Sequence, residues 1–301
     1  MTLLELIESC AQQLTDAQVV FGHGTTNAFD EAAWLVLHSL GLPLDTPVRG
    51  LDSQEKRPVT PAEHAQAATL LGARISSRKP AAYLTQEAWL QGVAFFVDER
   101  VIVPRSLIAE LLADGGIDYW LTESTRRVLD LCTGNGSLAV IAAMVYPDVE
   151  VEGADISIDA LDVAAINVAK HQLGERIALM HSDGLGNVRE PYDLILCNPP
   201  YVNAQSMSKL PAEYLAEPAI ALDGNQSGGK DGMDFIRKLL RDAPLHMNAN
   251  GVLVLEIGNE RTHFEAAFPS LEVVWLETSA GEDQVLLVVR EALLTLLHAP
   301  K

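Results

Sequence analysis

Apolar residues recur at helical spacing through residues 1–80, and no strand-like alternation interrupts them. One face of the first predicted helix is formed by Leu3, Leu4, Ile7, Ala11 and Leu14. A second apolar segment, at residues 34–37, stops before Gly41 and Pro43, residue types that commonly end helices. The start of the chain is therefore predicted to be helical.

A third helix is marked by its start signal. Thr60 is in the N-cap position, Pro61 is at the first helical position, and Glu63 completes a capping box. This helix is predicted to end near Ser77. We expect residues 1–80 to form a small helical domain that recognises the substrate.

The periodicity changes after residue 80. Short apolar runs at residues 88–90 and 93–97 flank Gln91-Gly92, a pattern typical of a β-hairpin. Residues 81–104 are therefore predicted to be a hairpin connector between two domains.

Strand and helix patterns alternate from residue 105 to residue 301, as in a parallel sheet with helical crossovers. The predicted strands are residues 127–131, 149–155, 177–181, 192–197, 251–257, 271–277 and 284–289. Only residues 278–283 separate the last two, too few for a crossover helix, so that pair is predicted to be antiparallel. The predicted fold is α/β, a Rossmann-like sheet of seven strands behind a small N-terminal helical domain and the hairpin.

Charge and hydropathy restrict the possible partners and location. The chain has 41 acidic and 21 basic residues, a net charge of −20, whereas nucleic-acid affinity comes largely from Lys and Arg. A basic protein partner is favoured over direct nucleic-acid binding, although acidity alone is equally compatible with a simple role in solubility. No apolar run reaches the roughly 18 residues of a membrane helix, and the start lacks the basic residues of a signal peptide. We therefore expect a cytoplasmic protein without membrane association.

The other reactive residue types indicate no second kind of site. Cys10, Cys132 and Cys197 are odd in number and far apart, which favours buried thiols over disulfides or a zinc site. The eight histidines form no metal-binding pair, and neither a nucleophile elbow nor a phosphate-binding loop is present. No metal is expected.

Glycines follow the first predicted strand of the sheet, in the sequence Thr-Gly-Asn-Gly. Gly134 and Gly136 permit a tight turn and close ligand approach, and the next strand ends in Asp155. A carboxylate at that place accepts both ribose hydroxyls of an adenosyl ligand, so a nucleoside cofactor is predicted. Asp183 and Gly184 follow the third strand, where a carboxylate either meets an adenine amino group or only stabilises a turn.

Residues 194–201 read Leu-Ile-Leu-Cys-Asn-Pro-Pro-Tyr, a buried strand that reaches the sheet edge and stops at Pro199 and Pro200. An amide nitrogen is a weak nucleophile because its lone pair is delocalised, and its NH2 group carries two donors that need fixed acceptors. The Asn198 side chain and the Pro199 carbonyl can accept from them, while Tyr201 can stack on the flat amide. The loop is therefore predicted to be the active site.

Together these motifs resemble the protein glutamine-N5 methyltransferases of the HemK type, within the seven-stranded class I methyltransferases. The resemblance runs from about residue 74 to residue 289 and is carried by Arg-Lys-Pro-Ala-Ala-Tyr-Leu at 78–84, Val-Pro-Arg-Ser at 103–106, Asp-Leu-Cys-Thr-Gly at 130–134, Asn-Pro-Pro-Tyr at 198–201 and Leu-Pro-Ala-Glu-Tyr-Leu-Ala-Glu-Pro at 210–218. The second and third of these motifs are similar to the PrmB branch, which acts on the third protein of the large ribosomal subunit. The release-factor branch usually has Ile-Pro-Arg-Pro and Asp-Leu-Gly-Thr-Gly. Leu107, Asn135 and Ser137 depart from the family pattern.

The resemblance implies that S-adenosylmethionine is the cofactor and that a glutamine side-chain amide, in a basic ribosomal protein not yet assembled, is the acceptor. The expected catalytic residues are Asn198, Pro199, Pro200 and Tyr201. The expected cofactor-binding residues are Asp130, Thr133, Gly134, Asn135, Gly136, Asp155, Ile156, Asp183, Gly184 and Asn198. Arg105 either faces the cofactor or pairs with an acid.

Several alternatives share parts of this pattern. A release-factor glutamine methyltransferase differs only in its substrate. Adenine-N6 and cytosine-N4 nucleic-acid methyltransferases use a similar Asn/Asp-Pro-Pro-aromatic loop, but flipping a base needs a basic cleft that this chain does not offer. A nicotinamide dehydrogenase has no use for residues 198–201, and a binding module without catalysis would keep the fold but transfer no methyl group.

Overall fold

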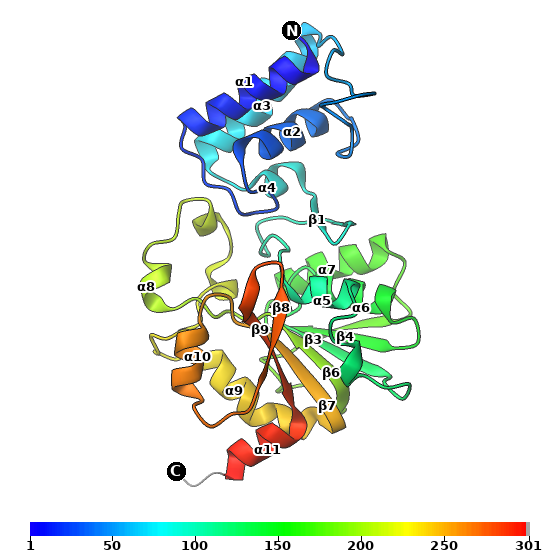
Figure 1. The fold of residues 1–301 in the computed structure, drawn as a ribbon, viewed down its shortest axis with the longest axis vertical. Helices are drawn as coiled ribbons and strands as arrows, with labels where there is room; N and C mark the ends of the chain where they lie inside the picture. Colours follow the sequence, from blue (N-terminus) through cyan, green and yellow to red (C-terminus); the bar gives the residue numbers. More distant parts are fainter. Residues whose placement is uncertain (299–301) are drawn as a thin grey trace.

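The structure is a computed structural model that describes residues 1–298. Its centre is a seven-stranded sheet in the order β5-β4-β3-β6-β7-β9-β8 (Figure 1). The strands are β3 (Arg127–Leu131), β4 (Glu150–Asp155), β5 (Ile177–His181), β6 (Tyr192–Cys197), β7 (Met247–Glu256), β8 (Val274–Thr278) and β9 (Gly281–Val289). Strands β3 to β7 pair in parallel, and β9 is antiparallel to both β7 and β8. The predicted fold class and the antiparallel last pair are confirmed.

The predicted strands differ from the observed ones mainly at their ends. Strand β7 begins four residues earlier than predicted, at Met247, where a register shift interrupts its pairing with β6. Strand β8 begins only at Val274, because a turn from Phe268 to Leu271 occupies the preceding residues. The final hairpin is tighter than predicted, since Thr278 already pairs with Gly281.

Helices cover both faces of the sheet, and each face has its own apolar core. Helices α5 (Ile108–Ala113), α6 (Ser137–Val145) and α7 (Ile158–Lys170) lie on one face, where α5 and α6 pack on residues such as Leu196 and Val254. Helices α9 (Asp234–Asp242), α10 (Arg261–Ala267) and α11 (Arg290–His298) lie on the other face, which includes Cys197 and Leu255. Alternate residues of one strand thus enter different cores.

The N-terminal helices α1 (Leu3–Asp16), α2 (Ala28–Ser39), α3 (Pro61–Ser77) and α4 (Ala81–Thr85) lie at one end of the molecule (Figure 1). The predicted capping box of α3 is present, because Thr60 accepts from Glu63 N and the Glu63 carboxylate accepts from Thr60 N. The N-terminal helices share a core with Ala160 and Val163 of α7. This part of the chain therefore packs directly on the sheet domain.

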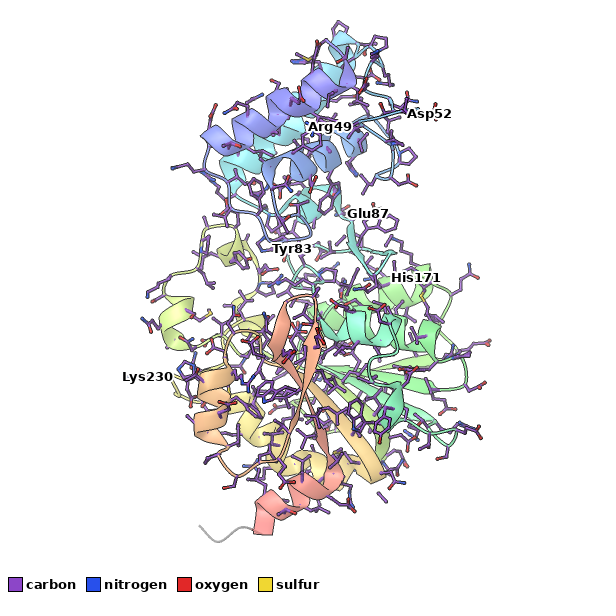
Figure 2. The ribbon with its side chains drawn as sticks, viewed as in Figure 1. Arg49, Asp52, Tyr83, Glu87, His171 and Lys230 are labelled. Atoms are coloured by element: carbon purple, nitrogen blue, oxygen red, sulfur yellow. The ribbon has the colours of Figure 1, made fainter. Side chains whose placement is uncertain are left out.

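The predicted hairpin is formed by β1 (Ala88–Leu90) and β2 (Val93–Phe95), an antiparallel pair. Tyr83 and His171, both labelled in Figure 2, anchor the region around this hairpin. The Tyr83 hydroxyl donates to the Val101 carbonyl, and the His171 ring lies 2.9 Å from the Ala94 carbonyl. Asn167 of α7 also bonds both the N–H and the carbonyl of Phe96, at 2.7 and 2.9 Å.

No helix among residues 1–298 is both long and apolar enough to cross a membrane.

Candidate active site

The carboxyl ends of β3, β4 and β6 meet at one edge of the sheet, where parallel sheets commonly bind ligands. A cavity of about 730 Å³ opens there. Seven of the predicted site residues line it: Gly134, Asp155, Ile156, Asp183, Gly184, Asn198 and Pro200. The strand order thus brings together four separate loops, those after β3, β4, β5 and β6.

Asp155 ends β4 and lines this cavity. Its carboxylate accepts hydrogen bonds from Gly134 N and Ser157 N, both at 2.9 Å, and so joins the loops after β3 and β4. Burial raises the pKa of Asp155 above its ordinary value, although these N–H groups act in the opposite direction. Gly134 has a φ of +55°, and an added Cβ would meet no atom closer than 4.0 Å, so its face of the cavity is open.

Four of the residues predicted to bind the cofactor, Asp130, Thr133, Asn135 and Gly136, do not line this cavity. Asp130 accepts from Thr133 Oγ1 and from Ala139 N, which ties the glycine loop to α6. The Asn135 side chain accepts from Ser137 N at the start of α6. Gly136 allows close helix packing, because an added Cβ would lie 3.1 Å from the Cβ of Ala164. These residues shape the loop and do not face the cavity.

Asp130 is also a buried carboxyl group. Burial raises its pKa to about 7, while hydrogen bonds from Thr133 and Ala139 act to lower it. Its Oδ1 has no hydrogen-bond partner among the residues that the structure describes.

The other end of the cavity is formed after β5. Asp183 is exposed at the rim, and its carboxylate is 2.8 Å from Lys238 Nζ of α9. Gly184 lies 3.6 Å, measured from an ideal Cβ, from the ring of Phe235, which lines the cavity as well. Phe235 was not predicted, because a single aromatic residue in an amphipathic helix has no distinguishing sequence pattern.

A second cavity, of about 1020 Å³, adjoins the first. Pro199 and Tyr201 line it, whereas Pro200 faces the first cavity. Asn198 lines both, as do Ile102 and Ala221. The predicted active-site loop therefore separates the two cavities, with Asn198 exposed to each.

Residues 101–107, here called the strap, cross the two cavities between the hairpin and α5. Arg105 lines the second cavity and also pairs with an acid, so it takes the second role considered for it. Its Nη1 and Nη2 donate to the two oxygens of Glu217, at 2.7 and 2.9 Å. Glu217 also accepts from Val103 N at 2.9 Å, which fixes the strap at two points.

Glu217 is fully buried, and its other neighbour comes from the N-terminal part of the chain. His23 Nε2 lies 3.5 Å from the Glu217 carboxylate, and both side chains are 1% exposed or less. Burial acts to raise the pKa of Glu217, but His23 and Arg105 outweigh it and hold this pKa at about 2. A buried ionic cluster thus joins the N-terminal helices to the strap.

Tyr214 extends this contact into the second cavity, which it lines. Its ring packs against that of His23 in a tilted arrangement, with 4.3 Å between centroids and 50° between the ring planes. Gly22 is required there, because its φ is +135° and an added Cβ would lie 2.3 Å from the Tyr214 hydroxyl. Glu213 makes a parallel connection by accepting from Val20 N and Arg78 Nη1, both at 3.2 Å.

The motif at residues 210–218 thus supplies two glutamates that bind other segments. Glu213 binds Arg78 at the end of α3, and Glu217 binds Arg105 of the strap. The sequence of this motif shows a family resemblance but does not by itself reveal these contacts. Two glutamates four residues apart in an otherwise apolar motif could have indicated buried acids, which need hydrogen-bond or ionic partners. No such signal marked His23.

A parallel sheet in this strand order, ending in an antiparallel pair and carrying paired cavities at its carboxyl edge, defines a class I methyltransferase. Residues 117–225 match the family described as Methyltransferase small domain. The chain belongs to the family of ribosomal protein uL3 glutamine methyltransferases.

Three curated relatives carry that name. The one from Bordetella pertussis is 51% identical and covers 98% of this chain and 97% of its own length. Those from Burkholderia pseudomallei and Neisseria meningitidis serogroup A are 48% and 46% identical, covering 95% and 97% of this chain and 94% of their own lengths. A solved structure, the hMettl16 catalytic domain in complex with MAT2A 3'UTR hairpin 6, has a TM-score of 0.51 at 14% identity and covers 76% of this chain and 81% of its own. That likeness concerns the fold alone.

Proposed function

We propose that this protein transfers a methyl group from S-adenosylmethionine to the N5 side-chain amide of a glutamine in ribosomal protein uL3. One observation carries the proposal: Asn198 lines both the cavity bounded by Asp155 and the cavity bounded by Tyr201. A donor in the first cavity and an acceptor in the second would meet at this side chain. The names of the relatives support the choice of substrate.

The first cavity suits S-adenosylmethionine in the chemistry of its lining residues. It is concave, and its lining combines apolar side chains with a few polar groups, as is usual for small-molecule sites. Asp155 would accept from the ribose hydroxyls, Gly134 leaves room for close approach, and Phe235 offers an apolar ring for the adenine. Because Lys238 already engages Asp183, an adenine contact from Asp183 would have to share that carboxylate.

The second cavity suits a planar amide. The Asn198 side-chain oxygen and the Pro199 carbonyl are acceptors for the two N–H bonds of a glutamine amide. Tyr201 provides a flat ring beside them, and its buried position keeps it neutral, since burial raises the pKa of its hydroxyl well above the ordinary value. Holding the amide in one orientation is the main contribution that these residues would make to the rate.

The protein substrate is expected to be basic. Residues 81–301 contain 32 acids against 15 bases, and opposite charge accelerates the encounter of two proteins. The N-terminal helices reach the second cavity through His23 and Tyr214 and would form its outer side. We therefore propose that residues 1–80 take part in recognising the substrate.

The test is methyl transfer from labelled S-adenosylmethionine to unmethylated candidate substrates. Free uL3, release factors and RNA would each be incubated with the purified protein, and the label located by mass spectrometry. The proposal requires label on one glutamine of uL3 and none after Asn198→Ala. Label on release factors alone would overturn the choice of substrate, and label on RNA would overturn glutamine chemistry.

A further inference from the structure

Glu256 and Asn198 are neighbours at the edge of the sheet. Strands β6 and β7 are parallel, and Cys197 is in register with Leu255. Asn198 and Glu256 each follow that pair by one residue, so their side chains point to the same face of the sheet, on strands about 4.8 Å apart. Both residues line the second cavity.

The Glu256 carboxyl group is 4% exposed and is held by the strap. Ser106 Oγ donates to its Oε2 at 2.5 Å, and Leu107 N donates to the same oxygen at 2.9 Å. Burial raises the pKa of Glu256 to about 7, and these hydrogen bonds only partly oppose it. A carboxyl group with such a pKa exchanges a proton readily near neutral pH.

The charged and titratable groups around Glu256 do not neutralise it. Arg105, on the strap, acts to lower its pKa less than the hydrogen bonds from Ser106 and Leu107 do, and it is already bound to Glu217 through two hydrogen bonds. Tyr201, on the active-site loop, is a further titratable neighbour, and the charges of Glu256, Glu260 and Glu217 all raise the pKa of its hydroxyl. Glu256 therefore faces the cavity without a cation committed to it.

The reaction needs a proton acceptor in this cavity. S-adenosylmethionine supplies a methyl group whose bond to sulfur breaks with its electron pair kept by sulfur, while a new bond forms to the amide nitrogen. That nitrogen must then release one proton. Asn198 and the Pro199 carbonyl orient the N–H bonds but are too weakly basic to take a proton away.

We propose that Glu256 is a catalytic residue that accepts this proton from the methylated amide nitrogen. The proposal rests on the proposed function. In the step, a nitrogen–hydrogen bond breaks, an oxygen–hydrogen bond forms on the Glu256 carboxylate, and the neutral N-methyl amide remains. Proton acceptance requires ionised Glu256, so the methyl-transfer rate rises with pH through the pKa of this group.

Two variants separate this role from a structural one. Glu256→Gln keeps an oxygen that can accept from Ser106 and Leu107, so the strap remains anchored, but it cannot take up a proton. We expect a single-turnover rate roughly 100-fold lower and no rise with pH. Ser106→Ala removes a hydrogen bond that favours the ionised form, so the rise should persist and move to higher pH.

Asp130→Asn is the matched control. Asp130 is another buried carboxyl group with a pKa near 7, but it faces the glycine loop instead of the second cavity. Whatever this variant does to cofactor affinity, the rise of the rate with pH should remain.

A measurement on the resting protein completes the test. Infrared difference spectra recorded across the pH range around 7 should contain two titrating carboxyl bands. Asp130→Asn should remove one of them, and the other should be removed by Glu256→Gln and shifted by Ser106→Ala. The inference is overturned if Glu256→Gln removes neither band, or if this variant keeps the pH-dependent rate of the wild type. If the wild type itself methylates no glutamine, the proposed function fails instead, and the infrared result still decides whether Glu256 titrates.

Discussion

Replacing Glu217 by glutamine should destabilise the protein in a pH-dependent manner. In the wild type the carboxylate accepts three hydrogen bonds, from Val103 N and from both terminal nitrogens of Arg105. Glutamine has nearly the same shape, but it leaves the charge of the partly buried Arg105, whose side chain is 27% exposed, without its carboxylate partner. Removing one member of a buried ion pair typically costs about 3–5 kcal/mol.

The pKa of Glu217 gives a second value for the stability that its charge contributes. Its lowering from 4.5 to about 2 corresponds to about 3 kcal/mol of stability. Because the pKa is lower in the folded state, this contribution is present above the unfolded pKa and is lost as the pH falls toward 2. Both arguments give a loss of about 3 kcal/mol near neutral pH.

Urea denaturation of the wild type and Glu217→Gln would measure the loss. The stability difference should be about 3 kcal/mol near neutral pH and about 1 kcal/mol smaller at roughly pH 3.5. Glu8→Gln is the control, since its pair with Arg49 has a similar distance of 3.1 Å but side chains that are more than half exposed. That variant should change stability by less than about 1 kcal/mol. The reasoning would be refuted if Glu217→Gln were as stable as Glu8→Gln, or if its stability difference from the wild type did not change with pH.

Three further predictions concern the site. Asp155→Ala should weaken S-adenosylmethionine binding by roughly 1–3 kcal/mol in calorimetry, because charge-assisted hydrogen bonds are lost, and unchanged affinity would contradict its assignment. Asn198→Ala should lower turnover about 100-fold or more while cofactor affinity falls much less, as separate kinetic and calorimetric measurements would show. Near-normal turnover would contradict the role of Asn198 in orienting the acceptor amide. Raising the salt concentration from about 50 to 300 mM should lower kcat/KM for whole uL3 more than for a short peptide around the same glutamine. Equal sensitivity of the two substrates would leave the acidic surface as a solubility feature.

Local patterns in the sequence were sufficient for most of the elements. Strands β3, β5 and β6 have the predicted bounds, because each is a short apolar run between turn residues. The α3 start was predictable from Thr60 and Glu63, since a capping box involves only residues three apart. The antiparallel last pair followed from the shortness of its connection.

The order of the strands, and with it the composition of the cavities, was decided by tertiary structure. Asn198 and Glu256 are 58 positions apart in the chain and become neighbours only because β6 and β7 pair in a particular register. Arg105 and Glu217 meet across 112 residues, and His23 joins them from another part of the chain. No periodicity or spacing encodes such contacts.

The same limit explains the predicted cofactor residues that face away from the cavity. The Thr-Gly-Asn-Gly sequence determined a tight turn after β3, since glycine alone adopts its backbone angles easily. Whether each glycine serves the ligand or the packing depends on what lies opposite. Gly134 faces the open cavity, whereas Gly136 faces Ala164 of a helix that the local sequence cannot place. Short-range physics determined the loop's shape, and long-range packing determined its neighbours.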